Sequence, residues 1–179
     1  MAAESKSRPQ DILDEDFWSF FEVCAPLSLL TPEKLFEIYT AMKYLESRKI
    51  QGDIVECGVW RGGAMMLAAK TLLKTGCTDR DIYLYDTFEG FVHRSEADKT
   101  YSGKEIGLHK IKNFQAEVES NISRIDYPKN RIHFVAGDVM KTINPDSHSS
   151  IAYLRLDTDT YQTTLHELEC LFDAVVPAA

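Results

Sequence analysis

A glycine-rich segment and a distant aspartate are the residues of this chain best suited to bind a ligand. Residues 53–63, DIVECGVWRGG, are typical of a short strand that runs into a tight glycine turn and then a helix. Glycine lets a ligand approach the backbone, and the first amides of a helix attract an anion or a carboxylate. A second apolar run ends on Asp86, 28 positions after Gly58, where a carboxylate can accept both hydroxyls of a ribose. This spacing predicts a site for a nucleoside-containing cofactor.

The ends of two further predicted strands carry residues of the same kind. The strand 131–136 is followed by Gly137, Asp138 and Val139, and the strand 151–156 is followed by Asp157. In an open parallel sheet the ligand lies beyond the carboxyl ends of the strands. Because all four predicted strands end on glycine or aspartate, we expect these residues to share one crevice.

Helices and strands that alternate along the chain must position these residues. The apolar pattern predicts helices over 16–24, 31–48, 62–74, 108–125 and 160–172, and strands over 54–57, 82–86, 131–136 and 151–156. This alternation predicts an open α/β sandwich, with a parallel sheet, helices on both faces and right-handed crossovers. Residues 87–107 show no period, and a loop of this length is often a lid. We expect a disordered arm over 1–10, an N-terminal helical cap over 11–50 and the ligand-binding core over 51–179.

The composition excludes several classes of partner. With 20 basic and 28 acidic residues the formal net charge is −8, which argues against a nucleic-acid partner. No apolar run is long enough to span a membrane, and the polar N-terminus is unlike a signal peptide. The four cysteines form no CxxC pair, so we expect free thiols in a reducing, cytoplasmic setting.

Three long motifs resemble the macrocin O-methyltransferase (TylF-type) family. They are ECGVWRGG at 56–63, YDTFEGF at 85–91 and LRLDTDTYQTT at 154–164, with Asp79-Arg80 before the second. The resemblance runs from about Thr31 to the C-terminus. It implies a Rossmann-like class I methyltransferase fold and an enzyme that transfers a methyl group from S-adenosylmethionine to a hydroxyl of a sugar or another small natural-product-like acceptor.

The resemblance also implies roles for particular residues. It places Glu56, Gly58, Val59, Arg61 and Gly62 around the methionine part of the cofactor, Asp86 at its ribose, and Gly137, Asp138 and Val139 near its adenine. It makes Asp157 a Mg²⁺ ligand and Asp159 the general base that takes the proton of the acceptor.

The chain departs from the family pattern at its C-terminus. The pattern continues with a Gly-Gly turn, a strand and an Asp-Asp pair that completes the metal site, whereas this sequence ends VVPAA at 175–179. We therefore expect a sheet without its last strands and an incomplete Mg²⁺ site. A truncated, a split and a degenerate form of the enzyme all fit this ending.

Other interpretations remain open at this stage. Asp159 is equally suited to cap the helix that begins near Thr160, and Trp60 is expected to pack in the core. A methyltransferase-like scaffold that has lost the metal site is the alternative function, and a homo-oligomer is compatible with the apolar N-terminal helices. A nicotinamide-dependent enzyme is disfavoured, since Trp60 interrupts the G-x-G-x-x-G spacing.

Overall fold

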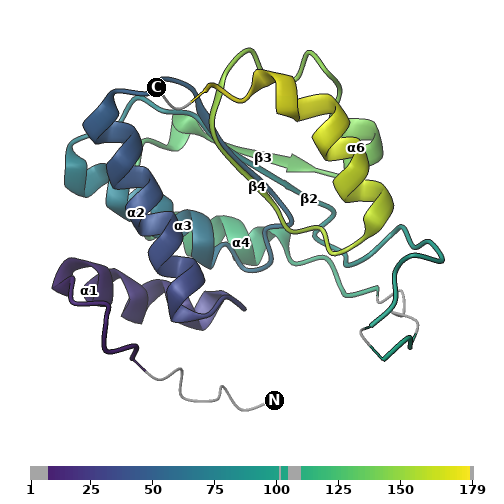
Figure 1. Ribbon diagram of the computed structural model, residues 1–179, viewed down its shortest axis with the longest axis horizontal. Coiled ribbons are helices and arrows are strands. Elements are labelled where there is room, and N and C mark those ends of the chain that lie inside the picture. Colours follow the sequence, from purple (N-terminus) through teal and green to yellow (C-terminus); the bar gives the residue numbers. More distant parts are fainter. Residues whose placement is uncertain (1–7, 101, 105–109, 178–179) are drawn as a thin grey trace.

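The computed structural model describes residues 8–100, 102–104 and 110–177 of the chain (Figure 1). Its centre is a sheet of four parallel strands in the order β3-β2-β1-β4. The strands are β1 (Asp53–Cys57), β2 (Ile82–Asp86), β3 (Ile132–Ala136) and β4 (Ile151–Leu156). The predicted parallel sheet is therefore confirmed.

Helices cover both faces of this sheet, as the alternating pattern predicts. On one face lie α1 (Glu15–Cys24), α2 (Pro32–Arg48), α3 (Gly63–Thr75) and α4 (Gln115–Ile122), and on the other α5 (Val139–Thr142) and α6 (Tyr161–Leu171) (Figure 1). Three short 3₁₀ turns complete the described elements: η1 (Ala25–Leu27), η2 (Lys129–Arg131) and η3 (Phe172–Ala174). Each face has its own apolar cluster, so the sheet is the middle layer of a sandwich.

The strand order creates a crevice at one end of β1. The chain leaves β1 toward β2 and β3, and then returns to add β4 on the other side of β1. The loops after β1 and β4 therefore diverge from a common edge, which is where open α/β sheets bind their ligands.

The N-terminal helices are fixed tightly to α3. Helix α2 begins at Pro32, and the Thr31 hydroxyl accepts a hydrogen bond from the Lys34 amide. A Cβ atom on Gly63 would lie 2.5 Å from the Cys24 carbonyl oxygen, so only glycine allows η1 to approach α3 this closely. This contact places residues 28–30 at the same end of the sheet as the crevice.

The start of one predicted helix needs correction. The helix predicted over 108–125 begins only at Gln115. Residues 110–114 instead bond to the segment after β2, through Ile111 N to Glu89 O at 2.8 Å and Phe114 N to Phe88 O at 3.1 Å.

Most of the predicted arm, residues 1–7, lies outside the described residues, while Arg8 forms an ion pair with Glu15 at 2.6 Å. Among the described helices, none has the length and apolar character to cross a membrane.

Candidate functional site

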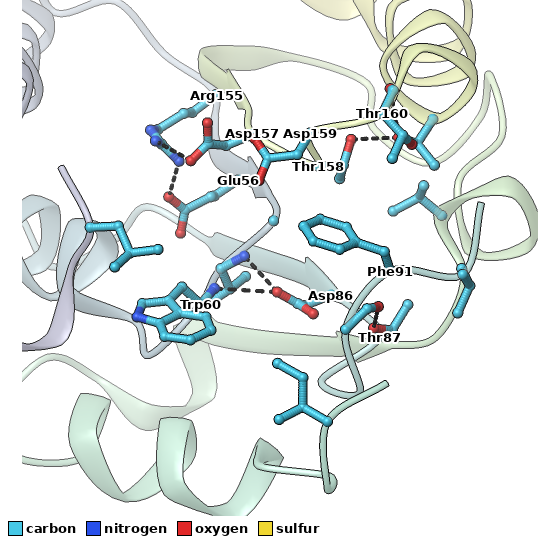
Figure 2. Close-up of a pocket in the computed structure, with 18 of the residues that line it drawn as sticks. Glu56, Trp60, Asp86, Thr87, Phe91, Arg155, Asp157, Thr158, Asp159 and Thr160 are labelled. Carbon is cyan, nitrogen blue, oxygen red and sulfur yellow. Dashed lines mark hydrogen bonds and ion pairs between the residues drawn. The ribbon is translucent and has the colours of Figure 1, made fainter. Parts of the chain in front are cut away.

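A cavity of about 280 Å³ lies beyond the carboxyl ends of the strands (Figure 2). All four strand ends contribute to its wall, as the sequence predicts for a shared crevice. The residues of the predicted site that line it are Glu56, Gly58, Val59, Asp86, Asp138, Val139, Asp157 and Asp159.

The glycine turn after β1 is closed by Asp86 of β2. Asp86 Oδ2 accepts hydrogen bonds from the amides of Val59 at 2.7 Å and Trp60 at 3.3 Å, and Oδ1 accepts one from Phe88 N at 2.7 Å. A carboxylate has about four acceptor positions, so roughly one remains for a ligand. The turn itself thus takes up much of the hydrogen-bonding capacity that the sequence assigns to a ribose.

Gly58 is the point at which this turn meets the chain after β4. Its φ is +84°, and a Cβ atom there would clash with the carbonyl group of Asp157. The close approach of the two loops therefore requires glycine for two separate reasons.

A partly buried ion-pair network lies beside the glycine turn, with Asp157 as its exposed member. Arg155 of β4 donates to Glu56 Oε1 at 2.8 Å and to Asp157 Oδ2 at 2.7 Å. Glu56 is only 1% exposed, and its Oε2 has no hydrogen-bond partner among the described residues. Burial raises the pKa of Glu56 to about 8, although the Arg155 guanidinium opposes the shift. In the sequence, Arg155 could have been singled out as a charged residue within the otherwise apolar strand 151–156.

Asp159 faces the cavity and does not cap the following helix. The side chain of Asp98, from the loop after β2, accepts the hydrogen bond of the first α6 amide, Tyr161 N, at 2.7 Å. Asp159 adopts a left-handed backbone, with φ of +62°, a strain that collects at functional sites. Burial, and then the neighbouring charge of Asp157, raise the pKa of the Asp159 carboxyl. The alternative of a capping role for Asp159 is therefore wrong.

The loop after β2 covers the cavity, as a lid would. Its residues Gly90, Phe91, Val92 and His93 line the wall, and the ring of Phe91 lies between Asp86 and Thr158 (Figure 2). The loop is attached to α6 through Asp98, which is 6% exposed and also accepts hydrogen bonds from Ser95 N and Oγ. The bonds from the Tyr161 and Ser95 amides hold the pKa of Asp98 below its usual value.

Replacing Asp98 with alanine should release this loop from α6. We expect faster amide hydrogen exchange over 90–100 and at the first turn of α6, since both segments lose the same carboxylate. The exposed Asp146, which accepts none of these bonds, provides the control variant Asp146→Ala. Unchanged exchange over 90–100 in Asp98→Ala would show that other contacts hold the loop.

Three residues of the predicted site do not line the cavity. Arg61 forms an ion pair with Glu117 of α4 at 3.2 Å, and Gly62 is the left-handed N-cap of α3. Gly137 has a φ of +139° at the end of β3 and is likewise absent from the wall. Their roles toward a cofactor stay predictions.

Trp60 does not pack in the core, contrary to expectation. It is 37% exposed, lines the cavity and contacts the ring of Phe114 edge-on at 6.0 Å. Its φ of +50° turns the chain so that the amide reaches Asp86 and the indole lies outside the apolar cluster.

Other residues of the wall carry no signal in the sequence. Ser28, Leu29 and Leu30 reach the cavity from the N-terminal cap, because the close packing of η1 on α3 places them there. Behind the wall, Glu167 of α6 is fully buried, and its Oε2 accepts a bond from the Thr158 hydroxyl at 3.3 Å.

The described residues do not fit a Mg²⁺ ion at Asp157. No group of three or more His, Cys, Asp or Glu side chains in the described part of the chain is arranged to hold a metal. One oxygen of the Asp157 carboxylate, Oδ2, is instead paired with the Arg155 guanidinium at 2.7 Å. The predicted metal role of Asp157 is therefore not supported.

The comparisons with known proteins agree with the geometry. The family model described as macrocin-O-methyltransferase (TylF) matches residues 24–179. The 8-demethyl-8-(2,3-dimethoxy-alpha-L-rhamnosyl)-tetracenomycin-C 4'-O-methyltransferase of Streptomyces olivaceus is 31% identical over 132 residues, 72% of this chain and 50% of that protein. The mycinamicin III 3''-O-methyltransferase of Micromonospora griseorubida is 29% identical over 134 residues, 72% of this chain and 52% of the relative. The chain thus spans about half the length of the curated relatives it matches.

Two solved structures share the fold. The O-methyltransferase NovP superposes with a TM-score of 0.70 at 24% identity, over 83% of this chain and 63% of its own. The calicheamicin methyltransferase CalS11 superposes with a TM-score of 0.69 at 19% identity, over 95% and 76%. The predicted Rossmann-like methyltransferase fold is confirmed, and with the family match over 24–179 the chain belongs to the macrocin O-methyltransferase (TylF) family.

Proposed function

We propose that this chain binds S-adenosylmethionine in the cavity at the carboxyl ends of its strands and transfers the methyl group to a hydroxyl of a sugar or a similar small molecule. The names of the curated relatives, which methylate hydroxyls of glycosylated natural products, support this class of acceptor. When bound, the cofactor supplies an electrophilic methyl group on a positively charged sulfur.

The unpartnered oxygen of Glu56 is the observation that carries the proposal. A buried carboxylate oxygen without a hydrogen bond is costly, and the Glu56 side chain that carries this one lines the cavity. The wall also contains Asp86, Asp138, Asp157 and Asp159, against the single guanidinium of Arg155. An ammonium group and a sulfonium are the kind of charges that such a wall stabilises, and S-adenosylmethionine carries both.

Each part of the wall then has a role toward the ligand. Glu56 accepts the ammonium group, and the acceptor position that Asp86 keeps beside its bonds to the turn amides receives a ribose hydroxyl. Asp159 receives the proton that the acceptor hydroxyl loses as the methyl group arrives. Burial suits Asp159 to this role, because a carboxyl whose pKa is raised is a stronger base. Positioning of the two reactants supplies much of the remaining acceleration.

Calorimetry with S-adenosylhomocysteine tests the proposal directly. We expect the folded chain to bind it, and Asp86→Asn to weaken the affinity roughly thirtyfold, since a charged hydrogen-bond acceptor of the site is lost. Asp81 directly precedes the first residue of β2, at the end of the strand opposite to Asp86. It accepts bonds from Arg131 and His133, so Asp81→Asn is the matched control. Absence of binding by the intact, folded chain would contradict the proposal.

A second candidate is a cofactor-binding module without transferase activity. The ion pair of Asp157 with Arg155 favours it, because this carboxylate is not free to assist the acceptor. Assays with S-adenosylmethionine and a panel of sugar and phenol acceptors separate the two candidates. Methyl transfer that is lost in Asp159→Asn would exclude the second.

A further inference from the structure

The loop after β2, whose residues 90–93 cover the cavity and are called the lid below, is attached to the core by a second contact, at the end of β3. His93 Nε2 donates a hydrogen bond to Asp138 Oδ1 at 2.8 Å. Both side chains line the cavity, and they are only 29% and 15% exposed. The contact joins residues 45 positions apart. It holds the loop after β2 against the end of the neighbouring strand, β3.

Asp138 uses its two oxygens very differently. Oδ1 accepts from His93 and from Met140 N at 3.1 Å, as the cap of α5. Oδ2 accepts no hydrogen bond among the described residues, and its nearest cation, Lys141 Nζ, lies 3.8 Å away on an exposed side chain. The bonds to Oδ1 outweigh the effect of burial and hold the pKa of Asp138 below its usual value. The carboxylate is thus charged, oriented by His93 and open on one side.

The position of this open oxygen matches a nucleobase. Asp86 and Asp138 follow adjacent strands, β2 and β3. A ligand whose ribose lies at the end of β2 would extend its base along the sheet toward β3. There, a carboxylate oxygen can accept an N–H of an exocyclic amino group but repels a carbonyl oxygen.

We infer that His93 is a positioning residue that orients Asp138 to select an amino-substituted purine, so that closure of the lid and recognition of adenine are one event. The inference rests on the proposed function of the same cavity. In this arrangement the imidazole fixes Oδ1, and the adenine amino group donates to Oδ2. The two bonds do not compete, because each uses its own oxygen.

The test compares two ligands that differ only at the purine. S-adenosylhomocysteine carries the amino group, and S-inosylhomocysteine carries a carbonyl at the same position. We expect His93→Phe, which keeps a ring but removes the donor, to weaken S-adenosylhomocysteine about tenfold in calorimetry. The affinity for S-inosylhomocysteine should change less than twofold, since that ligand gains nothing from Asp138. His93→Gln, whose amide can donate to Asp138, should restore most of the discrimination.

His133 provides a matched control. It donates to Asp81 at 2.7 Å, a bond of the same kind at the opposite end of the sheet, and His133→Phe should leave both affinities unchanged. If His93→Phe weakens both ligands equally, or neither, the inference is wrong while the proposed function stands. If the unaltered chain binds neither ligand, the proposed function fails first and the inference fails with it.

Discussion

Replacing Gly58 with alanine is expected to lower the free energy of unfolding by about 4 kcal/mol. The left-handed backbone, with φ of +84°, costs a residue with a Cβ atom about 1–2 kcal/mol. The clash with the carbonyl of Asp157 adds about 1–3 kcal/mol, the range of overpacked sites. The neighbour is backbone rather than a flexible side chain, so the strain cannot be relieved by a rotamer change. Urea unfolding followed by circular dichroism measures the difference.

Gly76 offers a control that separates the two costs. It has the same φ of +84° at the end of α3, but a Cβ atom there would have nothing within 4 Å. Gly76→Ala should therefore cost only the backbone contribution, about 1–2 kcal/mol. Equal losses in the two variants would mean that the approach of the β1 and β4 loops does not require glycine.

The sequence predicts the part of this site that depends on strands and their ends. The order of apolar runs places the strand ends Gly58, Asp86, Asp138 and Asp157 correctly, because a parallel sheet brings all its carboxyl ends to one edge. These residues need only the local pattern and one general rule of topology. The family resemblance adds roles to them but not their positions.

Residues whose role depends on a distant contact could not be predicted in this way. The sequence allows Asp159 to be a helix cap or a site residue, and the structure rejects the cap because Asp98, 63 positions before Tyr161, accepts the bond of the first α6 amide. Nothing in the local pattern indicates a role for His93, since its partner Asp138 is 45 positions away. The apolar pattern predicts too early a start for α4 for the same reason, because residues 110–114 bond to the segment after β2 rather than to one another.

Glu167 is another residue whose environment the sequence does not reveal. It is one of two acidic residues of α6, yet it is fully buried. Its Oε1 has no hydrogen-bond partner in the described part of the chain. Burial raises the pKa of Glu167 to about 7, against the opposing effect of the Thr158 hydroxyl. Thr158 lines the cavity, so this carboxyl lies directly behind the wall.

The raised pKa makes the stability of the fold depend on pH. Between about pH 4.5 and 7 the folded state keeps a proton on Glu167 that the unfolded state has lost, so stability falls as the pH rises. The contribution is fully present below the pKa of the unfolded chain and is gone above about pH 7. A shift of this size corresponds to about 3 kcal/mol.

Replacing Glu167 with glutamine should remove this pH dependence. The glutamine amide does not ionise, so its contribution to the free energy of unfolding is the same at every pH. Between pH 4.5 and 8 the variant therefore gains about 3 kcal/mol of stability relative to the unaltered chain. Urea unfolding at both pH values measures the change. Glu56, which is also buried with a raised pKa, contributes equally to both proteins and cancels in the comparison.

The exposed Glu169, two positions further along α6, supplies the control. Glu169→Gln should give a pH curve parallel to that of the unaltered chain, since its carboxyl is in water in both states. If Glu167→Gln also gives a parallel curve, Glu167 ionises in the folded state without penalty. In that case a polar partner must reach Oε1 through the cavity wall, and the wall would be open to solvent at Thr158.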